Sequence, residues 1–386
     1  MDSIFSIDKE YVAGTYGRFP VALVSGKGSI LTANDGKQYI DMGSGIGVTA
    51  FGTADEAWVN AVTAQLSKLQ HVSNLYYTEP CALLAKALCE KTGLKKVFFS
   101  NSGAEANECA IKVARKYSAQ KKGAGCYKIL TLVNSFHGRT LTTLSATGQE
   151  HYHELFQPLT PGFIHVKAGD EQALMDAIDG SIAGIMVEVV QGEGGVVPVS
   201  QSFMTACAKI AKEKDIPLII DEVQTGNGRT GKLYGYMHYG ITPDIVSTAK
   251  GLGGGLPIGA TLLSEKVQNV LQPGDHGSTY GGNPVACAGA LSVINRLDDA
   301  FLAQVEEKSN YVFRALENAP GVQAVTGKGL MIGIKTEKPA KEVVNACMEQ
   351  GVLCLTAKDK VRLLPALNIP MNVLEKAINI IKEACR

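Results

Sequence analysis

A carboxylate, Asp221, and a lysine, Lys250, stand in settings that suit catalysis. Asp221 directly follows the apolar run 218–220, which is typical of a strand buried on both faces of a parallel sheet, and ligands bind at the carboxyl ends of such strands. Lys250 lies in the glycine-rich stretch 249–259. A lysine amine can form a Schiff base with the aldehyde of pyridoxal 5'-phosphate (PLP), while a carboxylate keeps the pyridine nitrogen protonated. On these two residues alone, a capping aspartate and a solvated surface lysine remain an open alternative.

A second stretch has the residue types of a phosphate site. Residues 97–99 form a short apolar strand, and Ser102 and Glu105 that follow have the spacing of a helix capping box. The free N–H groups and positive end of a helix that starts there would bind a phosphate. An ordinary helix cap explains the same pattern.

Composition indicates an ordinary globular enzyme-sized protein. The chain has 386 residues, 45% of them hydrophobic and 19% charged, with 37 Lys and Arg against 37 Asp and Glu. Two or three domains are expected, and the balanced charge gives no attraction to nucleic acid or to an acidic membrane. No stretch of 18 apolar residues and no secretory signal is present, so we expect no membrane partner.

The cysteines favour a reducing compartment. Nine cysteines are scattered without a C-x-x-C pair, which indicates reduced thiols in a cytoplasmic protein and neither a zinc site nor a disulfide framework. The usual motifs of P-loop ATPases, dinucleotide-binding proteins and serine hydrolases are missing. No metal is expected at the site.

Longer strings extend these observations into a family resemblance. IIDEVQTGNGRTG (219–231) and PDIVSTAKGLGGGLPIGA (243–260) resemble the PLP-lysine region of the class III (ω-) aminotransferases, and the resemblance continues from about residue 11 to the end of the chain. It implies an α/β fold of the fold type I PLP-dependent transferases, which are aspartate aminotransferase-like. The large domain, 46–279, would carry a mostly parallel seven-stranded sheet. A small α+β domain would combine 1–45 with 280–386.

The same resemblance implies the cofactor residues. Lys250 would hold PLP covalently and then act as the base, and Asp221 would stabilise the pyridinium. The turn at 102–104 would bind the phosphate. Phe136 and Val223 would pack on the two faces of the ring and Gln224 would bind its phenolic oxygen, while Thr279 would bind the phosphate of the neighbouring subunit. The implied cofactor set is therefore Ser102, Gly103, Ala104, Phe136, Asp221, Val223, Gln224, Lys250 and Thr279.

Five further positions match substrate residues of the family. Tyr16 would line the pocket, Arg139 would read a substrate carboxylate and Ser278 would contact substrate. Glu193 would act as a gate that pairs with Arg362, the α-carboxylate arginine, and moves aside for 2-oxoglutarate. Tyr16 as a packing aromatic, and Arg139 and Arg362 as surface arginines, are the plainer alternatives.

Within the family, the acetylornithine aminotransferases are the most similar subfamily, by TYGRFP, FHGRT, QGEGG and HGSTYGGNP. That similarity implies transfer of the amino group of N2-acetyl-L-ornithine to 2-oxoglutarate, in arginine biosynthesis, by a homodimer. Ornithine, succinyldiaminopimelate and GABA aminotransferases share the cofactor site and stay open. A PLP enzyme that does not transaminate, and a PLP-binding protein without turnover, are more remote alternatives.

The positioning elements can also be predicted. We expect a hairpin within 1–45 that turns at 34–36, and helices near 55–68 and 79–92. The segment from residue 283 would begin one long helix that links the two domains. Val189 replaces a proline that the family usually has beside Glu188, which would shift the backbone slightly.

Overall fold

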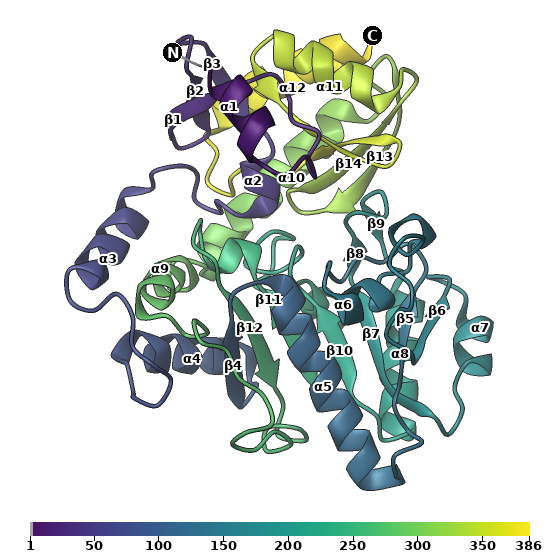
Figure 1. Cartoon of the computed structure of the whole chain (residues 1–386). Helices are drawn as coiled ribbons and strands as arrows, with labels where there is room; N and C mark the ends of the chain where they lie inside the picture. The colour runs from purple at the N-terminus through teal and green to yellow at the C-terminus, as the bar shows by residue number, and fades with distance from the viewer. Residues whose placement is uncertain (1–2) are drawn as a thin grey trace.

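The computed structural model describes residues 3–386, and a seven-stranded sheet forms its centre (Figure 1). The strand order is β4-β12-β11-β10-β7-β5-β6. Only β12 runs antiparallel, against both β11 and β4, so the predicted mostly parallel sheet is confirmed. In sheet order the strands are β4 (Lys96–Ser100), β12 (Gly259–Leu263), β11 (Ile245–Thr248), β10 (Leu218–Asp221), β7 (Ile182–Glu188), β5 (Lys128–Leu132) and β6 (Phe163–Val166).

The central strands are apolar because helices cover both faces of the sheet. Every residue of β10 is buried, and its side chains alternate between two hydrophobic clusters. Ile219 packs in the cluster of α5 (Gly103–Lys122), whereas Ile220 packs in the cluster of α8 (Gln201–Glu213). A strand that is apolar on both sides is therefore required here.

A second part of the molecule joins the two ends of the chain (Figure 1). The N-terminal strands form a four-stranded sheet with β15, because Val352 pairs with Ile40 in parallel register. The predicted turn at 34–36 separates β2 from β3. The strands of this part are β1 (Leu23–Lys27), β2 (Ile30–Ala33), β3 (Gln38–Asp41), β13 (Val322–Lys328), β14 (Met331–Thr336), β15 (Val352–Leu353), β16 (Leu355–Ala357) and β17 (Lys360–Leu363).

The pairing of β3 with β15 agrees with a small domain built from both ends of the chain. The boundaries 45/46 and 279/280 themselves stay a prediction, and residues 1 and 2 lie outside the described residues. In Figure 1 the purple N-terminal strands lie beside the yellow C-terminal part, above the large sheet.

The expected long linking helix is two helices, α9 (Pro284–Ile294) and α10 (Asp299–Leu316). Asn283 caps the first, with Oδ1 accepting hydrogen bonds from the N–H groups of Val285 and Ala286. Asp298 caps the second by accepting from the N–H of Phe301 at 2.8 Å. A new capping aspartate starts a new helix, and this signal in the sequence contradicts the prediction of one helix.

The helices predicted near 55–68 and 79–92 are confirmed as α3 (Glu56–Leu66) and α4 (Glu79–Thr92). No helix among the described residues is long and apolar enough to cross a membrane. The remaining elements are α1 (Ile4–Tyr11), α2 (Ser44–Gly47), α6 (Leu141–Ala146), α7 (Glu171–Asp176), α11 (Ala340–Glu349), α12 (Met371–Cys385), β8 (Val190–Gln191), β9 (Val197–Pro198) and the short 3-10 turns η1 (Glu150–Tyr152), η2 (Gly235–Tyr239) and η3 (Lys250–Leu252).

Candidate active site

The carboxyl ends of β5, β7 and β10 open into a cavity of about 610 Å³. Of the predicted site residues, only Ser278, Thr279 and Arg362 do not line it. Those that do are Tyr16, Ser102, Gly103, Ala104, Phe136, Arg139, Glu193, Asp221, Val223, Gln224 and Lys250. Segments that are remote in sequence therefore meet at one place, which is the edge of the sheet where ligands bind in open α/β folds.

Lys250 begins the 3-10 turn η3, separated from the end of β11 by one residue, at the start of the glycine-rich stretch. Its backbone has a φ of 45°, a conformation that costs roughly 1–3 kcal/mol for a side chain other than glycine. Burial lowers the pKa of the amine; the carboxylate of Glu193 opposes this and the charge of Arg362 adds to it. A lysine with a lowered pKa can act as a nucleophile or a base near neutral pH.

Asp221 lies at the end of β10 and is 4% exposed. Its Oδ2 accepts hydrogen bonds from Asn107 Nδ2 at 2.7 Å and from His137 Nδ1 at 2.8 Å. Its Oδ1 accepts from the N–H of Val223 at 2.9 Å. The carboxylate is fixed in position by three donors, as a group that must face one ring atom requires.

Two of these donors were not among the predicted site residues. His137, in the loop after β5, contacts Asp221 directly. Asn107 was missed, although it occupies the stripe of α5 that carries the buried Ala110 and Ala114. A polar residue in an apolar stripe was the available signal, because buried polar groups need partners.

Burial and neighbouring charges shift the pKa values of His137 and Glu188, which lie close to Asp221. Burial disfavours the imidazolium of His137, but the hydrogen bond and charge of Asp221, together with the charge of Glu188, raise the pKa of His137. Burial raises the pKa of Glu188 to about 7. Glu188 accepts hydrogen bonds from the N–H groups of Phe136 at 2.8 Å and Gly192 at 3.4 Å. It thereby joins the loop after β5 to the glycine loop.

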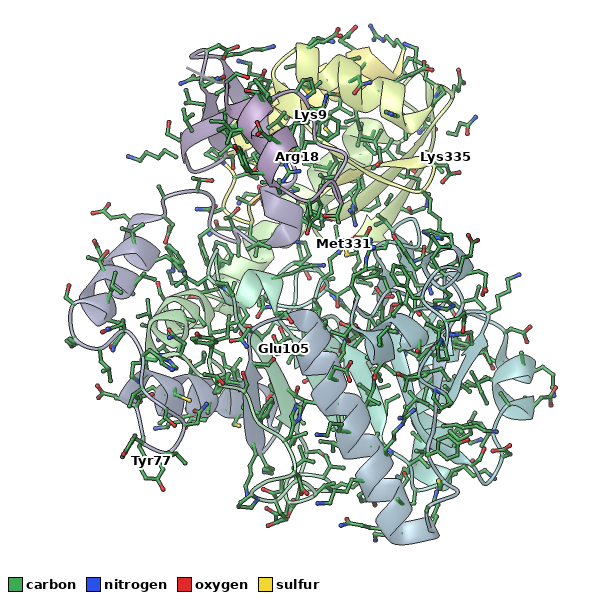
Figure 2. All side chains as sticks on the ribbon, viewed as in Figure 1. Lys9, Arg18, Tyr77, Glu105, Met331 and Lys335 are labelled. Carbon is green, nitrogen blue, oxygen red and sulfur yellow. The ribbon has the colours of Figure 1, made fainter. Side chains whose placement is uncertain are left out.

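The N-terminus of α5 forms one wall of the cavity. Ser102 caps the helix by accepting from the N–H of Glu105 at 3.2 Å, whose carboxylate in turn accepts from the N–H of Asn101 at 3.0 Å. A Cβ on Gly103 would lie 2.6 Å from a methyl of Val223, so this position has no room for a side chain. The first N–H groups of a helix have no partner inside the helix, and at this end of α5 they suit a phosphate. Figure 2 shows Glu105 at the end of α5 nearest the C-terminal part of the molecule.

Glu193, Gln224 and Arg362 form one cluster. Arg362 Nη1 contacts the Glu193 carboxylate in an ion pair, and it lies 3.4 Å from Gln224 Oε1. Burial raises the pKa of Glu193, but the charge of and hydrogen bond from Arg362 more than offset this, and the pKa is lowered. The predicted partners are therefore in contact, although Arg362 does not line the cavity itself. The role of the pair as a gate stays a prediction.

Two of the substrate-side residues, Tyr16 and Arg139, are exposed, whereas Arg362 is buried. Tyr16 is 74% exposed and lies below the guanidinium of Arg18. The guanidinium carbon of Arg139 lies over the ring of Tyr152, 4.4 Å from its centroid. Tyr152 was missed by sequence reasoning, because nothing in its neighbourhood marks it. Val189, the departure from the family pattern, is fully buried and its carbonyl accepts from the N–H of Val199.

Ser278 and Thr279 line a separate cavity of about 620 Å³. Ser278 Oγ nevertheless accepts a hydrogen bond from Asn101 Nδ2 at 3.1 Å, and Asn101 lines the main cavity. Ser278 is thus connected to the main cavity through Asn101, whereas Thr279 does not line that cavity in residues 3–386.

The residues of the main cavity fit PLP. A buried lysine suits the aldehyde, a fixed carboxylate suits the pyridine nitrogen and a helix N-terminus suits the phosphate. Phe136 and Val223 supply apolar surface for a flat ring. Asn107 Oδ1 and His137 Nε2 are buried without a hydrogen-bond partner among the described residues, which is consistent with a polar group beyond them.

Comparison with known proteins gives the same assignment. The family described as Aminotransferase class-III matches residues 11–385. An acetylornithine aminotransferase of Haemophilus ducreyi is 50% identical over 99% of this chain and 98% of its own, and that of Methanocaldococcus jannaschii is 44% identical over 98% and 96%.

Solved structures agree in fold. The ornithine aminotransferase of Toxoplasma gondii has a TM-score of 0.94 at 30% identity, covering 99% of this chain and 94% of that one. A second structure of that enzyme is described with PLP in partial occupancy at its active site. The N-acetylornithine aminotransferase of Stenotrophomonas maltophilia has a TM-score of 0.85 at 32% identity, covering 99% and 98%. This chain belongs to the class III aminotransferases.

Proposed function

We propose that this protein is an acetylornithine aminotransferase. It transfers the amino group of N2-acetyl-L-ornithine to 2-oxoglutarate and yields N-acetylglutamate 5-semialdehyde and glutamate. The observation that carries the proposal is the identity of 50% over 99% of the chain with an enzyme of that name. Ornithine aminotransferases are the second candidate, because one of them superimposes with a TM-score of 0.94, but at 30% identity.

The chemistry needs a cofactor that can hold an amino group between two substrates. PLP, when bound, carries that group and withdraws electrons from the reacting carbon. Lys250 Nζ would take the proton from the carbon that bears the reacting amine of the donor. Its lowered pKa leaves a larger fraction of the amine neutral for this task.

Asp221 would face the ring nitrogen of PLP with its charge. Asn107 and His137 donate to one of its oxygens, so the carboxylate is held against rotation. The N–H groups at the start of α5 would bind the phosphate, and Phe136 and Val223, which line the cavity, would hold the ring between apolar surfaces. Gln224 would bind the phenolic oxygen.

The two substrates differ beside the reacting carbon, where 2-oxoglutarate carries a carboxylate and the donor carries none, and the Glu193–Arg362 pair serves both. While the pair is closed, the positive charge of Arg362 is neutralised and a donor amine can approach. When Glu193 moves aside, the guanidinium is free for a carboxylate of 2-oxoglutarate. Arg139 binds the other carboxylate, since its planar group suits bidentate contact.

We further propose a homodimer in which Thr279 completes the phosphate site of the other chain. Support comes from the separate cavity that Ser278 and Thr279 line. The loop that carries Leu75, Tyr76 and Tyr77 is tied to it, because Asn74 Nδ2 donates to the Ser278 carbonyl at 3.0 Å. The side chains of these three residues are exposed, and Tyr77 projects from the edge of the molecule (Figure 2).

The compartment we propose is the cytoplasm, which the composition predicts. All nine cysteines are free thiols in the structure. Sedimentation would test the dimer, and a mixed dimer would test Thr279. Chains with Lys250→Ala and chains with Thr279→Ala, when combined, should regain activity if each site takes its threonine from the other chain.

The function is tested by the absorbance of the purified protein with PLP. N2-acetylornithine should bleach the visible band and 2-oxoglutarate should restore it. Bleaching by ornithine, GABA or succinyldiaminopimelate alone would keep the family and change the substrate. A band that no amine alters would contradict transamination itself.

A further inference from the structure

Within the part of the chain that the structure describes, no acidic side chain pairs with the charge of Arg139. Its side chain is exposed and lines the main cavity. Within residues 3–386, no carboxylate oxygen lies within 4.0 Å of its guanidinium. Arg362, the other arginine of the site, is by contrast paired with Glu193. Because the long side chain of Arg139 is flexible and has no acidic partner among these residues, another interaction must hold it toward the cavity.

Two aromatic rings supply this interaction. The guanidinium carbon of Arg139 lies 4.4 Å from the ring centroid of Tyr152 and 5.8 Å from that of Phe136. An arginine that stacks on a ring uses its flat face, which leaves its in-plane N–H donors free for a carboxylate. An acidic partner would occupy those same donors, and the substrate would have to displace it.

Tyr152 is itself held in place from both sides of η1. Gln149 Nε2 donates to the Ser135 carbonyl at 3.0 Å, and His153 Nε2 donates to the Leu144 carbonyl at 2.9 Å. Both amide and imidazole are buried. The ring of Tyr152 also meets Phe136 edge to face, with centroids 5.9 Å apart and planes at 70°. The loop therefore presents a fixed aromatic surface to the guanidinium.

We propose that Tyr152 is a positioning residue that sets substrate affinity by orienting Arg139. It touches the arginine by its ring face and need not touch the substrate. The substrate class that it favours is a molecule with a carboxylate at the end distant from the reacting nitrogen. The inference rests on the proposed function for the role of Arg139, and its test separates the two.

The first experiment replaces the ring. Tyr152→Leu and Tyr152→Met should raise KM for N2-acetylornithine by about tenfold, which is the upper range for loss of one cation–π contact, and change kcat less than twofold. Tyr152→Phe should behave as the parent protein because it keeps the ring face. Two apolar replacements are made so that poor folding of one does not remove the test.

A readout without catalysis accompanies the kinetics. Glutarate is a dicarboxylate that cannot react, and its dissociation constant with the PLP-loaded enzyme is measured by calorimetry. We expect the same tenfold weakening in Tyr152→Leu. A primary amine with no carboxylate, 1-aminobutane, should bleach the cofactor at the parent rate in every variant, since it has nothing for Arg139 to bind.

Two controls decide whether the effect passes through Arg139. In an Arg139→Ala background, Tyr152→Leu should have no further effect, because coupled residues are not additive. Phe163→Leu removes a comparable contact, that of Arg115 at 5.3 Å from the ring, away from the cavity, and should leave glutarate binding unchanged.

The outcomes that overturn the proposal are distinct. Tyr152→Leu could slow bleaching by 1-aminobutane as much as it weakens glutarate binding, or keep its full effect in the Arg139→Ala background. Either result would show that Tyr152 has a general structural role. If the parent protein does not use N2-acetylornithine but glutarate binding still depends on Tyr152, the proposed function is wrong and the positioning role stands.

Discussion

The cofactor side and the substrate side of the cavity are built differently. On the cofactor side, Asp221 is buried and receives three hydrogen bonds, and Lys250 is fixed by a strained turn. On the substrate side, Tyr16 and Arg139 are exposed, Arg139 stacks on Tyr152, and the buried Arg362 forms an ion pair with Glu193.

This difference separates two tasks. A group that does the same chemistry in every turnover is best held rigidly by buried partners. Side chains that must accept two substrates in turn need to be rearranged, and exposure makes this possible for Tyr16 and Arg139. At the buried Arg362, exchanging the Glu193 carboxylate for a substrate carboxylate keeps the guanidinium paired. Substitutions on the cofactor side should therefore cost activity with every substrate, whereas those on the substrate side should change the balance between substrates.

The sharpest test of the rigid side is Lys250→Ala. We expect a loss of at least about 10³-fold in kcat for every donor, since the variant lacks both the covalent attachment and the base. The visible band of covalently bound PLP should disappear with it. Lys86→Ala, on the exposed face of α4, is the matched control and should retain both. Appreciable turnover by Lys250→Ala would contradict the catalytic role that we assign to the cofactor side of the cavity.

Asn107→Leu tests whether the buried support of Asp221 matters. The substitution removes the hydrogen bond to the charged Asp221, worth about 1.5–3 kcal/mol, and a second one to the buried His137 carbonyl. We expect about 10- to 100-fold weaker PLP binding, equal losses in kcat for all donors and a lower melting temperature. PLP titration and thermal unfolding measure these. Asn310→Leu, at an exposed position of α10, is the control, and an unequal loss among donors would place Asn107 on the substrate side.

Glu193→Ala tests the adjustable side. Removing the carboxylate leaves Arg362 permanently free, so we expect KM for N2-acetylornithine to rise and KM for 2-oxoglutarate to fall, each by about three- to tenfold. PLP content should not change. Measuring the two half-reactions separately gives both constants. If the ratio of the two constants stays at its parent value, Glu193 is not a gate.

The smallest expected effect is on stability against pH. Glu188 has a folded pKa raised to about 7, so the folded state holds a proton that the unfolded state has lost above its pKa near 4.5, and stability falls as pH rises through this interval. The pKa of His137 is raised as well, so its contribution is present below its ordinary pKa and is also lost as pH rises.

Both groups act in the same direction, and the free energy of unfolding of the cofactor-free protein should decline from about pH 5 to about pH 8. Urea unfolding at several pH values measures it. Glu188→Gln should reduce the slope, and Glu222, whose pKa burial also raises to about 7, should account for part of the slope that remains. A stability that rises over this range would contradict the buried environment that we assign to Glu188.

The sequence by itself determined the cofactor side in large part. Its motifs are local: a buried strand ending in Asp221, a strand, turn and helix around Ser102, and a glycine-rich stretch around Lys250. In each motif the element and the chemical group are neighbours in the chain. Periodicity and turn residues therefore predicted both, and the family resemblance added the roles.

Only the tertiary structure decided which groups support them. The hydrogen bond from Asn107 to Asp221 joins positions 114 apart, and that from Arg362 to Glu193 joins positions 169 apart. Tyr152 reaches Arg139 because two buried hydrogen bonds fix its loop. Local pattern specifies a strand or a helix, but the contact between two side chains depends on how whole elements pack, and that is set by the complete core.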